Sequence, residues 1–525
     1  MTFTRRLQKG ENKYVYKVRT YREKGTGNVK QETQYLGKEV IKDGKTIIIP
    51  PKRKRTGLRE ILDYGTHLAL FNTAKEFGLV EVIQDALELH TRIESAGTKI
   101  VLLAINKITT EMTIRSISNW FSRSSLKERL DLTTDDLTYK KVRGILNLLS
   151  ETSPDVTGII EEAIIKKIKQ LYREDLNTAV YDLTALTYHG DNNNLAQYGQ
   201  AYGITGEKQI NMVLAVTLNN KLPLHHKVLP GKIVSVSTIH SFVKELEIFG
   251  VKNIVLILDR GFYSKRNIKE ILDAKHDVIG ALSSNLKITK KALTNSVKIE
   301  NSRNILKYPD HVIFFKEFQE ENFKIIVYHD VERRNRQIKT FYDDLAEVEN
   351  RLEELTEKEF ENRNDLNEEL EGVCGKYQTH ISFRFLKAND VWTFSYKLKH
   401  KSIQRSTNRF GKTVLFTTTS LSAVEVLKAY REKDVIEKTF QLMKKHGLSP
   451  INSNTEASTR ARIMLSYLGY LMLSLLRMKL DEDTSLEKCL STLGEVREVV
   501  YKDGTLDLPE LTKPQKKIMK MVELL

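Results

Sequence analysis

The segment Ile254-Val255-Leu256-Ile257-Leu258 places the strongest constraint on the fold of this chain. Five consecutive aliphatic residues are typical of a buried strand in a sheet that is covered by helices. Asp259 follows the run directly, so its carboxylate is expected at the carboxyl end of the strand, where open α/β sheets place their functional sites. An aspartate that caps the next helix is the alternative interpretation.

The sequence before this segment predicts an α/β domain. Short β-rich runs occur at residues 179–183, 212–218 and 222–228, and a helix-like segment lies at residues 237–249. Three neighbouring strands, a helix and then a buried strand that ends in a carboxylate follow the order of a ribonuclease-H-like domain. Many α/β folds share parts of this order, so it favours that class without establishing it.

Changes in residue pattern divide the rest of the chain. Alternation over residues 13–36 predicts a small basic β-hairpin, and helical spacing dominates from Gly57 onward. In residues 341–371, leucine and valine recur at seam spacing among dense acidic residues, which predicts a long charged helix paired with a second helix through Leu366 and Leu370. We therefore expect a multidomain α/β plus α protein. Its parts are a basic β-hairpin module and linker (1–56), an all-helical domain (57–175), a mixed-sheet core in two parts (176–300 and 411–480), an insertion of a charged helical hairpin and β-strands (301–410) and a C-terminal helical tail (481–525).

The charge balance indicates a polyanionic partner. The formal net charge is +16 and the pI is about 9.3. Residues 1–60 alone contain seventeen Lys or Arg against six Asp or Glu. Nucleic acid is the usual partner of such a chain, and we expect the run Lys52-Arg53-Lys54-Arg55 to contact phosphates. A solvated charge run is the alternative for this segment, and a merely basic protein is the alternative for the whole chain.

Composition also excludes several classes of protein. Two cysteines, Cys374 and Cys489, exclude a disulfide scaffold and a Cys-rich zinc module. The N-terminus has no apolar signal core, and the apolar run 463–476 is shorter than the roughly twenty residues that span a bilayer. We expect a cytoplasmic protein with no membrane partner, in which this run forms a core helix. His225 and His226 are interpreted as ordinary polar residues, because no second cluster has the spacing of metal ligands.

Asp182 is a second candidate metal ligand on the predicted sheet. Cleaving and rejoining a phosphodiester requires an activated water or 3′-hydroxyl and charge relief on the leaving oxygen. Two divalent metal ions about 4 Å apart supply both, and Mg²⁺ or Mn²⁺ prefers carboxylate oxygens. Asp182 lies inside a predicted strand, on the face opposite Tyr181 and Leu183. A half-exposed strand position is the alternative.

Glu437 lies on a predicted helix that begins at the capping-box pattern Ser422-Ala423-Val424-Glu425. Tyr430, Lys433, Glu437 and Lys444 are spaced by three, four and seven residues, so they fall within a stripe of roughly 60° on that helix. An acid flanked by two bases and a phenol can hold a metal ion and contact the phosphates on either side of it. A solvated charged face is the alternative.

At these residues the chain resembles the DDE transposases of bacterial and archaeal insertion sequences, in particular the group with a Tyr-x2-Arg-x3-Glu-x6-Lys signature. Tyr430, Lys433, Glu437 and Lys444 keep that spacing, with Lys in place of Arg. The motifs of the two aspartates are matched by Asp182-Leu183-Thr184 and by Asp259-Arg260-Gly261-Phe262. Lys433 keeps the positive charge of the arginine but lacks its bidentate fork, so fine positioning of a phosphate could differ.

The resemblance implies a ribonuclease-H-like domain interrupted by a β-rich insertion. It also implies that Asp182, Asp259 and Glu437 hold Mg²⁺ or Mn²⁺, as two ions. The expected partners are the double-stranded DNA of the element ends and of the target, bound by a homodimer or higher assembly in a nucleoid-associated, prokaryotic setting. The residues expected to contact this DNA are Tyr430, Lys433, Lys444, Arg260 and the basic run 52–55.

The implied activity is cut-and-paste DNA transposition, in which the enzyme binds the inverted ends of a mobile element, cleaves there and joins the ends to target DNA. A metal-dependent nuclease of the same fold that does not integrate is one alternative. An inactive transposase relic that only binds DNA is another, and a structural helical protein without a DNA role is a third.

Overall fold

The computed structural model describes most of the chain, and the predicted residues Asp259, Arg260 and Lys52 to Arg55 lie outside the described part. The described residues are 2–10, 12–22, 29–42, 45–49, 57–88, 94–151, 155–172, 178–199, 206–232, 239–251, 254–258, 262–306 and 312–525. The chain separates into two compact units. One unit is Met1–Leu62 with Arg497–Leu511, and the other is Asp63–Val496 with Thr512–Leu525.

The first unit contains two antiparallel sheets. The predicted β-hairpin is instead a sheet of four strands in the order β1-β2-β3-β4, because Thr2–Lys9 pairs along its whole length with β2. The hydrophobic side chains that hold it, Val15 and Val18, are buried on the central strand β2. Its strands are β1 (Thr2–Lys9), β2 (Asn12–Arg22), β3 (Val29–Lys42) and β4 (Lys45–Ile49), and the second sheet has the order β19-β18-β5, from β5 (Leu58–Asp63), β18 (Arg497–Tyr501) and β19 (Leu506–Asp507).

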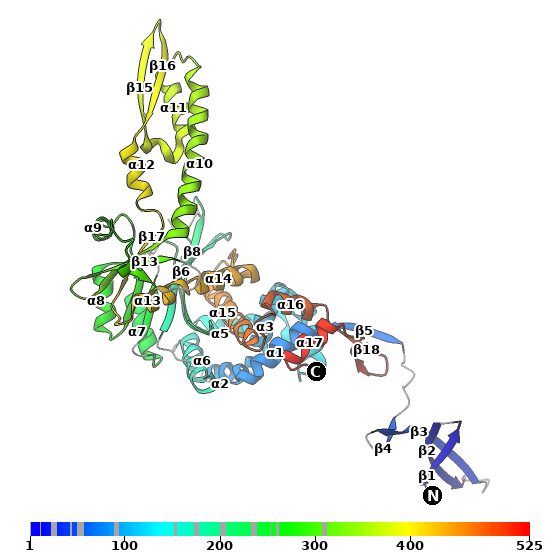
Figure 1. Cartoon of the computed structure of the whole chain (residues 1–525). Coiled ribbons are helices and arrows are strands. Elements are labelled where there is room, and N and C mark those ends of the chain that lie inside the picture. The colour runs from blue at the N-terminus through cyan, green and yellow to red at the C-terminus, as the bar shows by residue number, and fades with distance from the viewer. Residues whose placement is uncertain are drawn as a thin grey trace. The chain divides into compact units, whose positions relative to one another are not determined.

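The second unit begins with helices packed around one long apolar helix, α15 (Glu456–Met478), which contacts α1, α3 and α5 (Figure 1). The predicted core helix over 463–476 is therefore confirmed. Gly469 allows this packing, since a Cβ there would lie 2.4 Å from Cγ2 of Ile108 on α3. The surrounding helices are α1 (Gly65–Phe77), α2 (Leu79–Glu88), α3 (Ala96–Thr109), α4 (Ile117–Ser122), α5 (Tyr139–Glu151), α6 (Val156–Tyr172), α16 (Leu486–Gly494) and α17 (Lys513–Met521). Within the described part of the chain, the helices are too short or too polar to span a membrane.

A large mixed sheet forms the rest of the second unit, in the order β12-β13-β14-β17-β11-β10-β6-β8-β7, with β9 paired to β8. The two contacts of β10, with β6 and with β11, are parallel, and the other pairings are antiparallel. The strands are β6 (Thr178–Thr187), β7 (Gln197–Tyr198), β8 (Lys208–Thr217), β9 (Pro223–Pro230), β10 (Val255–Leu258), β11 (Asp277–Ala281), β12 (Ile305–Leu306), β13 (Ile313–Gln319), β14 (Lys324–Asp330) and β17 (Lys412–Thr417). The accompanying helices are α7 (Ile239–Ile248), α8 (Lys265–Asp273), α9 (Lys287–Asn295), α13 (Ala423–Arg431) and α14 (Asp434–Met443). A mixed α/β fold with a dominant sheet was thus predicted correctly.

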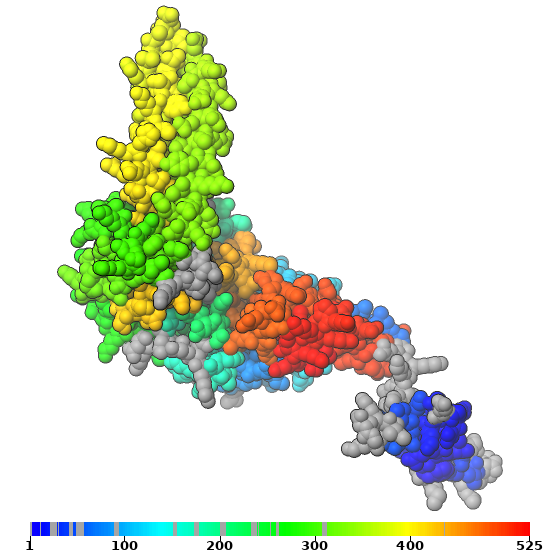
Figure 2. Space-filling view, in the orientation of Figure 1, coloured from blue at the N-terminus to red at the C-terminus, as the bar shows by residue number. Residues whose placement is uncertain are grey.

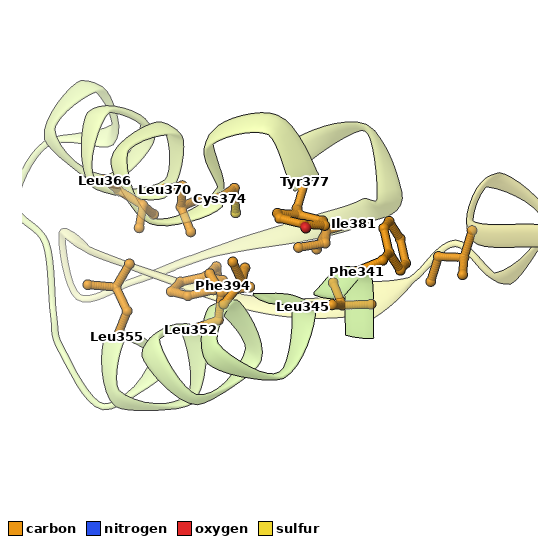
Figure 3. Packing of buried hydrophobic residues seen from close by; sticks show 12 residues of the cluster. Phe341, Leu345, Leu352, Leu355, Leu366, Leu370, Cys374, Tyr377, Ile381 and Phe394 are labelled. Atoms are coloured by element: carbon orange, nitrogen blue, oxygen red, sulfur yellow. The ribbon is translucent and has the colours of Figure 1, made fainter. Parts of the chain in front are cut away.

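A projecting segment, here called the tower, separates β14 from β17 (Figures 1 and 2). It consists of α10 (Val331–Thr356), α11 (Arg363–Cys374), a 3-10 helix (Gly375–His380), β15 (Ile381–Ala388), β16 (Val391–Leu398) and α12 (His400–Thr407). The tower has its own core, in which the predicted helical pair packs through Leu345, Leu352, Leu366 and Leu370 (Figure 3). Strands β12 to β14 fall inside the predicted insertion 301–410, but they join the large sheet, so the tower begins at α10.

Candidate active site

Asp182 lies in the middle of β6, the strand between β8 and β10 in the large sheet. It pairs with Leu214 of β8, and its side chain is buried, at 8% exposure. The neighbouring Tyr181 points to the other face, where its ring packs edge-on against Phe242 of α7 and against Phe262. Because strand side chains alternate between faces, Asp182 faces the opposite side of the sheet from α7. A buried carboxylate there requires positively charged partners.

Lys444 lies close enough to Asp182 for their charges to interact. Burial lowers the pKa of Lys444, and the negative charge of nearby Asp182 opposes that shift. Lys444 begins a turn of π-helix, Lys444–Leu448, that directly follows α14. Helix α14 itself packs against β6. The structure therefore brings together the predicted residues Asp182 and Lys444, which are far apart in the sequence.

The path of the chain after Lys444 explains how it reaches β6. The backbone N–H of Ile451 donates to the carbonyl of Thr187 over 2.8 Å, and the N–H of His189 donates to the carbonyl of Ile451 over 2.9 Å. Tyr188 and Ile451 thus form a parallel bridge beside the end of β6. The segment that follows Lys444 is therefore anchored, at Ile451, to the end of the strand that carries Asp182.

Gly447 makes the turn possible. Its φ is +78°, and a Cβ at this position would lie 1.2 Å from Oε1 of Glu111. Glu111 is paired with Lys107 of α3 over 2.9 Å. Arg462 of α15 donates to the carbonyls of Gly447 and Pro450, over 3.2 and 3.3 Å. The helical part of the unit therefore positions Lys444, a role that the local sequence pattern did not indicate.

Glu437 lies on α14, and its side chain is 52% exposed. Its Oε1 is 3.1 Å from Nζ of Lys433, which is itself buried. The Lys433 ammonium also lies over the ring of Tyr430, 5.9 Å from the centroid. Lys433 therefore contacts two other residues of the predicted stripe, Glu437 and Tyr430. Because Thr439 of α14 shares a 2.8 Å hydrogen bond with Tyr470 of α15, the inner side of α14 is fixed while Glu437 faces outward.

The prediction of one continuous helix for this stripe was wrong. The capping box of Ser422 and Glu425 is present and starts α13, but α13 ends at Arg431 and α14 begins at Asp434. At the junction, the N–H of Lys433 donates to the carbonyl of Tyr430 and the N–H of Ile436 donates to that of Lys433. These three-residue bonds wind the chain more tightly than an α-helix does. Lys444 then lies beyond the end of α14, in the π-helical turn.

His225 and His226 are not the ordinary polar residues that the sequence suggested. Both are buried on β9, and each donates from Nδ1 to the carboxylate of Glu161 on α6 over 2.5 Å. His225 also contacts Glu245 of α7, over 2.8 Å from Nε2, and Lys227 pairs with the same carboxylate over 2.5 Å. We call these five residues the Glu161 cluster. It joins α6 and α7 to the sheet, and it was missed because its acids lie far from the histidines in sequence.

Charge pairing shifts the pKa values in this cluster. Burial would raise the pKa of Glu161, but the charges of His225 and His226 outweigh it and lower the pKa to about 2. Burial would lower the pKa of His225, but Glu161 and Glu245 outweigh it and raise the pKa to about 9. Near neutral pH, Glu161 and His225 are therefore both charged, and they form a buried ion pair.

No group of three or more His, Cys, Asp or Glu side chains suited to a metal ion occurs among the described residues. Asp182 and Glu437 are both described, whereas the third predicted ligand, Asp259, follows the last described residue of β10. Both described residues offer hard carboxylate oxygens, which suit a divalent ion such as Mg²⁺. Each also has a lysine beside it, Lys444 and Lys433 respectively.

A buried acid within a mixed sheet, with Lys444 from the turn after α14 near it, is suited to chemistry on a phosphodiester. The family model described as transposase DDE domain matches residues 175–472, more than half of the 525 residues. The chain belongs to the transposase DDE domain family. It is a DNA transposase, an enzyme of DNA cleavage and transposition, and enzymes of this family generally depend on divalent metal ions.

Comparison with solved structures finds a piggyBac transposase synaptic complex with hairpin DNA. The match covers 82% of this chain and 79% of that one, with 11% sequence identity and a TM-score of 0.39. A likeness of that degree does not define a common fold. No curated protein matches the sequence.

Proposed function

We propose that Asp182, Asp259 and Glu437 form the metal-binding carboxylate set of this transposase, and that they hold two Mg²⁺ or Mn²⁺ ions. The observation that carries the proposal is the packing of α14, with Glu437, against β6, with Asp182, together with the proximity of Lys444 to Asp182. Acid and base residues from distant parts of the sequence meet at one strand. That convergence is what a metal-dependent site on phosphates requires.

The strand arrangement supports a ribonuclease-H-like core. Strands β6, β8 and β9 are consecutive antiparallel neighbours, and α7 then leads to β10, which returns parallel beside β6. Ile257 of β10 pairs with Val180 of β6. Asp259 and Asp182 each follow one member of that pair by two residues in the sequence. Strands β6 and β10 run parallel, and each aspartate comes two residues after a member of the same pair. This spacing is consistent with two carboxylates that act together.

The bases around this set would bind the DNA backbone. Lys433 and Lys444 would contact the phosphates on either side of the scissile bond, aided by Tyr430 and Arg260. This is the role of the Tyr-x2-Arg-x3-Glu-x6-Lys signature, here with Lys433 as the second residue. A lysine acts on a phosphate as a point charge, without the two parallel hydrogen bonds of an arginine. Bound divalent ions would supply activation of the attacking oxygen and stabilisation of the leaving oxygen.

The remaining parts of the proposal concern the DNA. The enzyme would bind the inverted ends of its element as a homodimer or higher assembly, with the helical segment 57–175 and the basic N-terminal module on the ends. The basic run 52–55 would contact phosphates, so binding would weaken steeply with salt. After cleavage, the freed 3′-hydroxyls would be joined to target DNA.

Cleavage of a duplex that carries the element end and its flanking DNA tests the carboxylate set. Asp182→Asn, Asp259→Asn and Glu437→Gln should each lower the Mg²⁺-dependent rate by at least about 100-fold, since even outer-sphere partners of a metal contribute about 10–100-fold. Retention on the same duplex in EDTA should change little. Glu432→Gln, which alters an exposed acid just before α14, is the matched control and should cut at the wild-type rate.

Normal cutting by any of the three variants would remove that residue from the set. A strand-transfer step in the same assay, with a pre-cut end and a supercoiled target, separates a transposase from a nuclease that does not integrate. Joined product from the wild type is expected.

A further inference from the structure

The two sides of the tower differ strongly in charge. From Asp343 onward α10, together with α11, contains ten Asp or Glu and two Arg. Strands β15 and β16 with α12 contain five Lys or Arg and no Asp or Glu. If the charges of the tower only kept the protein soluble, acidic and basic residues would be mixed evenly over both sides. Segregation of this kind indicates that the sheet side meets a polyanion while the helical side avoids it.

The pairing of β15 with β16 defines which residues the sheet side presents. Phe383 pairs with Tyr396 and Phe385 pairs with Phe394. Phe394 belongs to the tower core (Figure 3), and the other three aromatic residues pack against that core. Because side chains alternate, the intervening pairs point away from the core. These outward pairs, here called the ribbon face, are Ser382 with Lys397, Arg384 with Ser395, and Leu386 with Thr393.

The ribbon is held firmly enough to present this face in one geometry. The guanidinium of Arg363, at the start of α11, lies 5.0 Å from the ring centroid of Phe385 and 5.3 Å from that of Trp392. Phe360 and Trp392 exchange backbone hydrogen bonds of 3.1 and 2.6 Å. Arg384, Ser395 and Lys397 are exposed on the other side of the same strands.

We propose that the ribbon face binds double-stranded DNA in the major groove. The inference rests on the transposase function, and it adds a DNA-reading surface to the tower. A two-stranded antiparallel ribbon fits the major groove, which is about 12 Å wide. Arg384 can donate two hydrogen bonds to the edge of a guanine, Leu386 can contact a thymine methyl group, and Lys397 can pair with a phosphate.

The charge of the tower favours one orientation on the DNA. The acidic part of α10 from Asp343 onward and α11 are repelled by phosphates, so of these two sides the ribbon face is the one that can approach a duplex closely. A second copy of the chain, with its acidic helices against the ribbon face, is the other conceivable occupant. DNA is favoured because the face carries Arg, Lys, Ser and Thr, the side chains that hydrogen-bond base edges and phosphates.

Retention of the full-length protein on a duplex that carries the element end and flanking DNA, in EDTA and over a range of salt, is the first test. The double variant Arg384→Ala with Lys397→Ala should bind about tenfold more weakly, and its slope of log affinity against log salt should fall by about 1 to 2. The control, Arg351→Ala with Lys358→Ala, removes two charges from the acidic side and should bind like the wild type. Equal loss in both variants would overturn the proposal.

Crosslinking gives a second test that does not depend on loss of binding. Both native cysteines, Cys374 and Cys489, are buried, so an introduced exposed cysteine can be labelled selectively with a photoactivatable crosslinker. The Ser395→Cys protein should crosslink to the duplex, and the Glu368→Cys protein, labelled on the acidic side, should not. Crosslinking from position 368 alone, or from neither position, contradicts the proposal.

A measurement of self-association distinguishes the two candidate partners of the ribbon face, which are DNA and a second copy of the chain. If the Arg384→Ala, Lys397→Ala variant loses self-association in sedimentation velocity but keeps full DNA retention, the ribbon face is a protein interface and the proposal is wrong. Both DNA tests are made without metal, so they stand apart from the carboxylate set. If the protein showed no activity in the cleavage assay, the results of the retention and crosslinking tests would still stand.

Discussion

At the scale of single residues, the structure places Lys444 near Asp182 by a route that spacing in the sequence did not indicate. The spacing of Tyr430, Lys433, Glu437 and Lys444 predicts one face of one helix. The structure instead brings Lys444 to Asp182 through a turn after α14. That turn depends on contacts of Gly447 with Glu111, which lies just after α3, and with Arg462, which lies on α15. Periodicity reports only neighbours on the same element, so it could not reveal these distant contacts.

Gly447 should therefore be sensitive to the addition of a side chain. Gly447→Ala is expected to lower the free energy of unfolding by somewhat more than the about 1–2 kcal/mol that a positive φ alone costs a residue with a Cβ, because the Glu111 carboxylate must also move away and give up its pairing with Lys107. It should also displace Lys444 and slow DNA cleavage. Urea unfolding and the cleavage rate measure the two effects.

Gly206→Ala is the matched control for this prediction. Its φ is +82°, and a Cβ there meets no described atom within 4 Å, so it reports the cost of the backbone conformation alone. Equal destabilisation by the two substitutions would contradict the close-contact explanation. Normal cleavage by Gly447→Ala would show that the turn does not position Lys444.

At the scale of elements, strong local patterns were reliable and weak ones were not. The capping box at Ser422 and the leucine seam of α10 are both present as predicted, because a cap and a seam are determined within about one or two turns of helix. Strands β12 to β14 were assigned to the insertion although they extend the large sheet. Alternation specifies that a segment forms a strand, but it does not specify which sheet the strand joins.

The seam predicts how the tower responds to a cavity. Leu352 on α10 is fully buried in the tower core, so Leu352→Ala should destabilise the tower by about 2–5 kcal/mol. Limited proteolysis within residues 331–411 should become faster, since local opening exposes cleavage sites. Tyr342→Ala, an exposed position on the same helix at 49% exposure, is the control and should change proteolysis little. An equal increase in both variants would argue against the seam as the source of tower stability.

At the scale of the whole second unit, the Glu161 cluster connects the helices to the sheet that carries Asp182. Glu161 comes from α6, the histidines from β9 and Glu245 from α7. Strand β9 pairs with β8, and β8 pairs with β6, so the cluster lies two strands away from Asp182. Contacts between residues so distant in sequence follow from the packing of elements, and for that reason the histidines could not be interpreted from the sequence. We expect the cluster to stabilise the unit rather than to act on DNA.

The stability that the cluster provides should depend on pH in a defined direction. The pKa of Glu161 is lowered to about 2, so its contribution is present above its ordinary pKa of 4.5 and is lost as the pH falls through about 2. The pKa of His225 is raised to about 9, so its contribution is present below its ordinary pKa of 6.5 and is lost as the pH rises through about 9. Both contributions are complete only between about pH 4.5 and 6.5. Three other groups lie next to the Glu161–His225 pair, namely His226, Glu245 and Lys227. Lys227 pairs with Glu245 and so partly neutralises its charge.

Glu161→Gln should therefore lower the free energy of unfolding by about 3–5 kcal/mol near pH 6, the usual loss when one partner of a buried ion pair is removed. The difference from the wild type should shrink as the pH rises toward 9, because His225 then loses its charge in the wild type as well. Urea unfolding can be followed by the fluorescence of Trp120 in a Trp392→Phe background, which leaves one tryptophan of the two in the chain. Glu162→Gln breaks only a surface pair with Lys166, so it should cost no more than about 1 kcal/mol. A loss for Glu161→Gln that stays constant from pH 6 to pH 9 would mean that burial and packing of the side chain, rather than the ion pair with His225, hold α6 to the sheet.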